Sequence, residues 1–152
     1  MEDKKNSCIF CRVITHELAS SRVYEDEDCL AFMDIFPLRT GHVLVMPKHH
    51  HQHLEELPAT LRARLWELAN QIGGAMRQSS TPPDGIHYIV NDGRAAFQTV
   101  PHLHIHVLPR RRGDALGLLG QVLKRPLLPL LKPVARTKLD RQARELSSRL
   151  IG

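Results

Sequence analysis

Three histidines at alternate positions are the clearest chemical feature of this 152-residue chain. His102, His104 and His106 are separated by Leu103 and Ile105. An alternation of period two predicts a β-strand, on which the three imidazoles share one face at spacings of about 6–7 Å. Imidazole titrates near neutrality, binds metals and acts as an acid, a base or a nucleophile. The stretch therefore predicts a strand that is buried on one side and displays reactive imidazoles on the other.

The composition is that of a single globular domain. The chain has 42% hydrophobic residues and is long enough to bury a sizeable core. It contains no apolar run of the ~18–20 residues that a membrane span requires, and its polar start shows no signal peptide. Its three cysteines, an odd number, argue against a secreted disulfide framework. We therefore expect a cytoplasmic protein with no membrane partner.

The charge of the chain permits anionic partners. The net charge is +5, which suits nucleotides and is also compatible with nucleic acid. Much of the excess lies in Arg110–Arg112 and in the segment after Lys124. We interpret both as solvated basic surface and do not expect a nucleic-acid partner.

The elements that must position the histidines follow from apolar spacing. Helical spacing predicts a short helix that includes 9–14 and a long amphipathic helix from Pro58 to about Gln78. Extended patterns predict five strands, which lie at 22–25, 29–35, 42–46, 86–90 and over the triad itself. Strands in series, interrupted by only two helices, indicate an α+β domain with an antiparallel sheet.

The composition changes after Gly113. Residues 116–131 are apolar but broken by glycine and proline, and residues 134–150 return to helical spacing. We expect a flexible N-terminus over 1–6, a domain over 7–114 and a C-terminal helical tail over 115–152. The apolar stripe of this tail must pack on its own domain or on a second subunit.

Several motifs together resemble the histidine triad family. The stretch 102–108 matches the family pattern of three histidines alternating with apolar residues. Other matching segments follow the family's order and spacing at 8–11, 32–35, 41–47, 91–93 and 98–100. The resemblance covers about residues 7–114 and is strongest to the bacterial Hint-like branch, with features similar to the Fhit branch. It implies a five-stranded antiparallel sheet with one short and one long helix, and a homodimer.

The resemblance also implies a mechanism. His104 would attack the α-phosphate of a purine nucleotide, giving a covalent nucleotidyl-histidine that water resolves. His106 would contact the phosphate or protonate the leaving group, and His102 completes the catalytic row. No cofactor is required for this chemistry. The activity implied is that of a purine nucleoside phosphoramidase, with dinucleoside polyphosphate hydrolysis as the alternative.

The nucleotide-binding residues are carried over by the same resemblance. Asp34 matches the carboxylate that accepts hydrogen bonds from the ribose hydroxyls. Asn91, Gln98 and Thr99 match positions that offer donors to the phosphate. The apolar cleft around the base corresponds to Ile9, Phe10, Val13, Phe32, Met33 and Ile35.

A second group of residues suits a metal. Cys8, Cys11, His50 and His102 offer two thiolates and two imidazoles, a set that fits tetrahedral zinc. Some bacterial members of the family look similar in carrying such a structural zinc. His50 aligns best, and its rivals as the fourth ligand are His49, His51 and His53. The alternative is a pair of reduced, half-buried cysteines on a short helix.

One departure from the family pattern and two rival functions remain to be weighed. Phe97 stands where many members have glycine, which bears on substrate preference. One rival is a non-catalytic module that binds nucleotides or nucleic acid through the basic tail. The other is a metal-binding protein built on the histidines, for which chelation would abolish activity.

Overall fold

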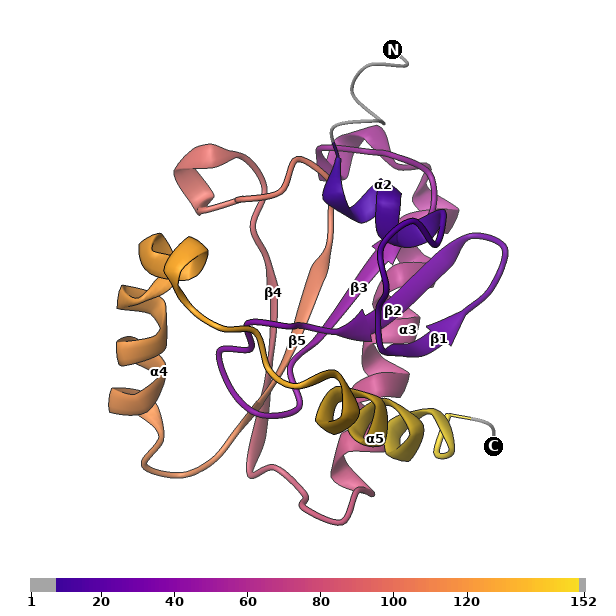
Figure 1. The fold of residues 1–152 in the computed structure, drawn as a ribbon. Coiled ribbons are helices and arrows are strands. Elements are labelled where there is room, and N and C mark those ends of the chain that lie inside the picture. The colour runs from indigo at the N-terminus through magenta and orange to yellow at the C-terminus, as the bar shows by residue number, and fades with distance from the viewer. Residues whose placement is uncertain (1–7, 151–152) are drawn as a thin grey trace.

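A computed structural model describes residues 8–150 as one five-stranded antiparallel sheet with helices on both faces (Figure 1). The flexible N-terminus expected over 1–6 lies outside the described residues. The strands are β1 Arg22–Glu25, β2 Cys29–Met33, β3 Val43–Pro47, β4 Gly85–Val90 and β5 Ile105–Arg110. The helices are α2 Ile9–Ile14, α3 Ala59–Arg77, α4 Ala115–Leu123 and α5 Arg136–Ser147. Three 3₁₀ segments complete the set: η1 Leu54–Glu56, η2 Arg94–Ala96 and η3 Arg125–Leu130.

The order of strands in the sheet is β1-β2-β3-β5-β4, and every pairing is antiparallel. This confirms the predicted α+β fold. Strand β5 lies inside the sheet, where Leu44 of β3 is opposite His106 and Val45 is opposite Ile105. Because successive side chains of a strand point to opposite faces, this register fixes which residues of β5 meet the core and which meet the site.

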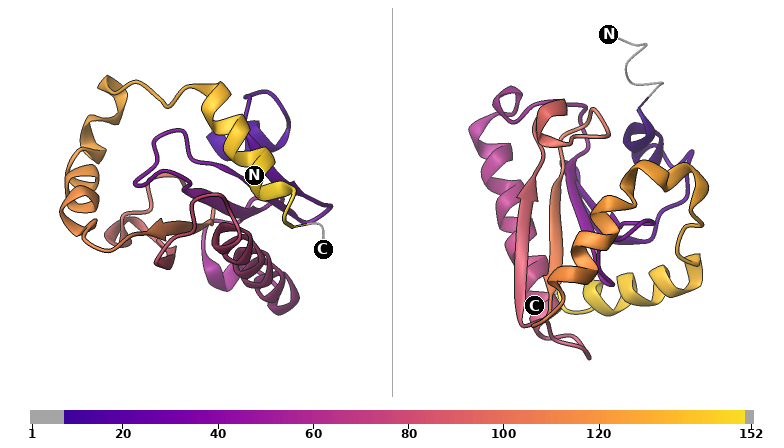
Figure 2. Two further views of the ribbon diagram at one scale, coloured as in Figure 1. Left: turned by 90° about the horizontal axis from the view of Figure 1, so that it is seen from below. Right: turned by 90° about the vertical axis from the view of Figure 1, so that its left-hand side faces the viewer.

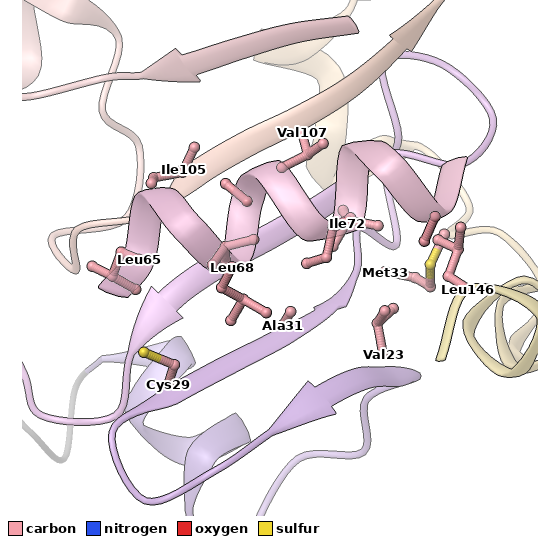
Figure 3. Close-up of a cluster of buried hydrophobic side chains, with 14 of the residues drawn as sticks. Val23, Cys29, Ala31, Met33, Leu65, Leu68, Ile72, Ile105, Val107 and Leu146 are labelled. Atoms are coloured by element: carbon pink, nitrogen blue, oxygen red, sulfur yellow. The ribbon is translucent and has the colours of Figure 1, made fainter. Parts of the chain in front are cut away.

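One face of the sheet packs against α3 (Figure 3). Buried residues of α3 recur at spacings of three and four, as an amphipathic helix requires. They meet the alternate residues of the strands that point to this face. The labelled members of this main core are Val23, Cys29, Ala31, Met33, Leu65, Leu68, Ile72, Ile105, Val107 and Leu146.

The opposite face of the sheet carries a smaller core under α2. Phe10 and Val13 of this helix pack against Phe32 and Leu44, which are neighbours of main-core residues in sequence but point the other way. The ring centroids of Phe10 and Phe32 are 5.7 Å apart in an edge-on arrangement. The small core therefore forms the apolar floor of the face to which His106 points.

The triad stretch is only partly a strand. Strand β5 begins at Ile105, so His102 and His104 precede the ladder that we expected to include them. The reason lies in their hydrogen bonds: the Leu103 amide donates to the carbonyl of His51, and the His102 amide donates to the carbonyl of Val100. The predicted alternation survives, since Leu103 is buried in the main core with Ile105.

The C-terminal segment folds back over the domain. Helix α4 and segment η3 lie on the side of the sheet away from α3 (Figure 2). The segment is fastened where it leaves the sheet, because Asp114 accepts hydrogen bonds from Arg110 and pairs with Arg39 at 3.3 Å. It is fastened again where the Val134 amide donates to the carbonyl of Ile35 at 2.9 Å.

Helix α5 supplies part of the main core. Leu139, Ala143 and Leu146 are buried there, so the apolar stripe of the tail packs on its own domain. Arg136 and Asp140 at its start also bind the hydroxyl of Ser21. The boundary at residue 114 stays a prediction. Within residues 8–150, no helix combines the length and apolarity needed to cross a membrane.

Candidate active site

A cavity of about 530 Å³ opens on the α2 side of the sheet and contains two of the three histidines expected to be catalytic, whereas His102 does not line it. His104 and His106 line it together, with their ring centroids 4.7 Å apart. Its other expected lining residues are Asp34 and Thr99, and the apolar Ile9, Phe10, Val13, Phe32 and Ile35. The structure thus gathers most of the predicted nucleotide site around one hollow.

His104 is held in a single tautomer. Its Nδ1–H donates to the carbonyl of His102 at 2.7 Å, so the lone pair of the neutral ring lies on Nε2. Burial lowers the pKa of His104, against opposing contributions from that carbonyl and from Asp34. Phe10 stands edge-on to the ring at 5.0 Å between centroids. Burial therefore favours the neutral ring that a nucleophile requires, and the hydrogen bond determines which nitrogen carries its proton.

His106 is oriented by a second buried histidine, His42. The Leu38 amide donates to Nδ1 of His42 at 3.2 Å, which leaves the proton of His42 on Nε2. That Nε2–H lies 3.0 Å from Nδ1 of His106 and donates to it. Nε2 of His106 must then carry a proton, and it is a buried atom without a hydrogen-bond partner among the described residues. Burial lowers the pKa of both rings to about 3, so both are neutral at pH 7.

Asp34 lies between this histidine chain and the cavity. Its Oδ1 accepts from the Phe36 amide at 2.8 Å. Its Oδ2 lies 3.4 Å from Nδ1 of His42 and 3.6 Å from a guanidinium nitrogen of Arg125. The carboxylate is 8% exposed and lines the cavity beside the two histidines. Oδ1 is thus bound to the backbone at close range, whereas the contacts of Oδ2 are longer.

The loop expected to bind phosphate is built differently from the prediction. The side chain of Gln98 is used at both ends: its oxygen accepts from the Gly93 amide at 2.8 Å and its nitrogen donates to the Gln52 carbonyl at 2.9 Å. Gln98 therefore braces the loop. Asn91 lies at the end of β4 and does not line the cavity, whereas the exposed Thr99 does.

The structure also shows where Met33 and Phe97 lie relative to the cavity. Met33 does not line the cavity; it is 1% exposed in the main core, because it follows Phe32 on a strand and points to the other face. Phe97 has φ +64°, a left-handed backbone conformation that glycine adopts without strain. Its ring is 83% exposed.

The four proposed metal ligands come together beside the triad. Their ligand atoms all lie within 4.8 Å of one another. Nδ1 of His102 is 3.6 Å from each cysteine sulfur, and Nδ1 of His50 is 3.3 Å from Sγ of Cys11. Tetrahedral zinc with its usual bond lengths separates sulfur and nitrogen ligands by about 3.6 Å. The geometry therefore fits zinc, and the His102 ring is positioned for it because its Nε2–H donates to the Pro47 carbonyl at 2.8 Å.

The rival histidines do not belong to the cluster of ligand atoms that Cys8, Cys11, His50 and His102 form. His53 pairs with Asp92 at 2.7 Å, and His49 is exposed. His51 uses its carbonyl to accept from the Leu103 amide. Among these histidines, His50 has the ring nitrogen that meets the cysteine pair.

Two residues of the site were missed by sequence reasoning. His42 stood in a run of apolar strand residues, and nothing in that run distinguished it from a core histidine. Arg125 lay in the apolar tail, where no periodic pattern pointed to the cavity that it lines. A lone histidine between glycine and a buried strand was the one available signal for His42.

The fold and the row of buried imidazoles define a histidine triad protein. Residues 15–113 match the sequence model of the family described as the HIT domain, and the chain belongs to this family. A solved zinc-bound histidine triad family protein from Mycobacterium smegmatis superposes with a TM-score of 0.77 and is 36% identical. That comparison covers 96% of this chain and 94% of the other.

Two relatives with named activities are similar over most of the chain. One is adenylylsulfatase HINT3 of Arabidopsis thaliana, 36% identical over 144 residues, which are 95% of this chain and 68% of the relative. The other is adenosine 5′-monophosphoramidase HNT1 of Candida albicans, 33% identical over 115 residues, which are 74% of this chain and 75% of the relative. As a member of this family the protein is a nucleotide-binding hydrolase.

Proposed function

We propose that this protein cleaves purine nucleoside phosphoramidates at the α-phosphorus, with His104 as the nucleophile. The observation that carries the proposal is the 2.7 Å hydrogen bond from Nδ1–H of His104 to the His102 carbonyl. It places the reactive lone pair on Nε2, in a cavity that also holds Asp34. The names of the two relatives support an adenylyl substrate, although they differ in the group that leaves.

The chain's own residues divide the work as follows. Nε2 of His104 attacks the phosphorus, the bond from phosphorus to the leaving amine breaks, and the amine takes up a proton from water. Nε2–H of His106 donates to the charged phosphoryl group, which is where charge develops in the transition state. Water then attacks the phosphorus, the bond to His104 breaks, and the nucleoside monophosphate leaves with His104 restored.

The same nucleophile serves the alternative substrate, a dinucleoside polyphosphate. Only the leaving group differs, since a nucleotide is released where an amine would be. The experiment is to measure AMP release from an adenosine phosphoramidate and from diadenosine tetraphosphate. We expect turnover of the phosphoramidate, with loss of several orders of magnitude in His104→Ala and little change in His87→Ala, which removes an exposed histidine.

The result can contradict the proposal in three ways. Faster turnover of the tetraphosphate would favour the alternative substrate. Binding of AMP without turnover of either compound would favour a non-catalytic nucleotide-binding module. Equal activity of His104→Ala and the wild type would remove His104 from the nucleophile's role.

We also propose that Cys8, Cys11, His50 and His102 hold a structural zinc. Zinc would act as a crosslink between α2 and the start of the triad stretch. It would be structural and would take no part in the reaction. Metal analysis of the purified protein should give one zinc per chain, and chelation should lower the melting temperature while turnover at low temperature persists. Metal-free protein with an unchanged melting temperature, or a Cys11→Ser variant that retains zinc, would contradict the proposal.

We further propose that the protein is a cytoplasmic homodimer. Strand β4 lies at an edge of the sheet, where Tyr88 is 37% exposed, and α3 exposes Trp66 to 41%. Aromatic groups at an unpaired edge suit an interface between two copies. Cys8, Cys11 and Cys29 form no disulfide with one another, which suits a reducing compartment. Sedimentation of the full chain as a monomer at micromolar concentration would contradict the dimer.

A further inference from the structure

The C-terminal segment contributes a cation to the nucleotide cavity. Arg125 begins η3 directly after α4 and lines the same cavity as His104 and His106. It lies outside residues 15–113, the part of the chain that matches the family. The contacts of Asp114 and Val134 anchor both ends of the stretch that carries Arg125, and Arg125 lies beside Asp34 in this cavity.

The charged groups lining the cavity are few. Apart from the histidines, the described lining residues include one carboxylate, Asp34, and two cations, Arg125 and Arg136. Arg136 is committed to the protein, since it donates to the Ser21 hydroxyl at 3.2 Å and to the Ala19 carbonyl at 3.0 Å. Arg125 has its ion pair with Asp34, at 3.6 Å.

The ion pair between Arg125 and Asp34 is long, so a ligand could replace Arg125 at the carboxylate. Charge-assisted hydrogen bonds between guanidinium and carboxylate groups are about 2.7–2.9 Å long, so the contact of Arg125 with Asp34 is looser than a good one. The side chain of Arg125 is 26% exposed, which leaves it room to move. A nucleotide whose ribose takes Oδ2 of Asp34 would compete with Arg125 for that oxygen and would bring a negative charge into the same cavity.

We propose that Arg125 is a substrate-binding residue that releases Asp34 to the ribose and binds a tetrahedral oxyanion of the nucleotide. The proposal rests on the function proposed above, since it assumes that ribose meets Asp34. The guanidinium fork matches two phosphoryl oxygens, and it adds a positive charge beside the group that becomes more negative in the transition state. The oxyanion is either the α-phosphate or an anionic leaving group such as phosphate or sulfate.

The test measures binding to the full chain by calorimetry. The ligands are adenosine, AMP and α,β-methylene-ADP, and the proteins are the wild type, Arg125→Gln, Arg125→Lys and Lys124→Gln. Lys124 is the matched control, because it is an exposed cation next to Arg125 that does not line the cavity. We expect Arg125→Gln to lose about ten- to a hundredfold in affinity for a phosphorylated ligand, as charge-assisted hydrogen bonds predict.

Adenosine has no phosphate, so its affinity shows whether Arg125 contributes to binding in any way other than through the anion. Its affinity for Arg125→Gln should be unchanged or higher, since the variant no longer competes for Asp34, and Arg125→Lys should recover part of the AMP affinity. An equal loss for AMP and the diphosphate analogue assigns Arg125 to the α-phosphate, and a loss confined to the analogue assigns it to the leaving group.

Two outcomes overturn the inference. One is an equal loss of adenosine and AMP affinity in Arg125→Gln, and the other is unchanged affinity for all three ligands. Failure of the wild type to bind any of them would instead overturn the proposed function, and the role of Arg125 with it.

Discussion

His42 offers a direct test of how the site fixes a proton. Its Nε2–H donates to Nδ1 of His106, and its Nδ1 accepts from the Leu38 amide. The two bonds can be removed one at a time. In His42→Asn the side-chain oxygen can replace Nδ1 and keep the Leu38 bond, whereas in His42→Gln the side-chain nitrogen can replace Nε2 and keep the bond to His106.

The size of the effect follows from what His106 loses. Without the bond from His42, the His106 ring is free to carry its proton on Nδ1, and its Nε2 becomes an acceptor that would repel a phosphoryl oxygen. Loss of one preorganised donor to a developing charge costs about 10²–10³ in kcat. The buried Nδ1 of His106 left without a donor also costs about 1–3 kcal/mol of folding free energy.

The assay combines turnover with a direct view of the proton. We expect His42→Asn to lose about 10²–10³ in kcat for the adenosine phosphoramidate, and His42→Gln to retain most of it, at comparable losses of thermal stability. Nitrogen-15 NMR of the His106 ring should report the Nε2–H tautomer in the wild type and in His42→Gln, and a changed tautomer in His42→Asn. Equal kcat values for the two variants would refute the reasoning, because the bond to His106 would then be irrelevant to turnover.

Two further predictions concern stability. Phe97→Gly should relieve the left-handed backbone at φ +64° and raise the free energy of unfolding by up to about 1 kcal/mol, seen as a melting temperature a few degrees higher. Phe97→Ala, which keeps the Cβ atom, should not, and an equal gain in both variants would place the strain elsewhere. For Asp26, burial raises the carboxyl pKa but is outweighed by hydrogen bonds from Arg64, the Cys29 amide and Tyr24, which lower the pKa to about 2. A carboxyl group whose pKa is depressed by folding stabilises the fold above its unfolded pKa, near 3.8, and this stabilisation is lost as the pH falls to about 2. Asp26→Asn should therefore lower the free energy of unfolding by at most about 2 kcal/mol at pH 7 and by almost nothing at pH 2. Denaturant titrations at both pH values check this, with the exposed turn residue Asp28→Asn as control; a cost for Asp26→Asn that is the same at both would contradict it.

Much of the fold could be predicted because its signals are local and repetitive. The alternation around Leu103 and Ile105 indicated which side of the triad stretch is buried, and the spacing of apolar residues in α3 located the long helix within one residue of its end at Arg77. The spacing of Cys8 and Cys11 predicted a candidate pair of metal ligands, and the fold brings this pair together with His50 and His102. Each of these depends on a pattern that neighbouring residues impose.

The parts that could not be predicted depend on contacts between distant segments. His42 and His106 are 64 residues apart, and only the pairing of β3 with β5 brings them together. Arg125 reaches Asp34 because α5 anchors the tail, which no local pattern of 116–131 expresses. The side-chain bonds of Gln98 and the late start of β5 likewise arise from backbone groups of the segment around residues 51–52, whose positions are set by the tertiary fold.

The two fastenings of the C-terminal segment have an evolutionary consequence. Asp114 is held by Arg39 and Arg110 at one end, and Val134 is held by the Ile35 carbonyl at the other, while α5 completes the core. The twenty or so residues between these points contribute little to the interior, and α4 is without buried residues. Insertions, deletions and substitutions there should therefore be tolerated without unfolding the domain. Under the role proposed for Arg125, exchanging this one surface segment would change substrate preference without altering the triad.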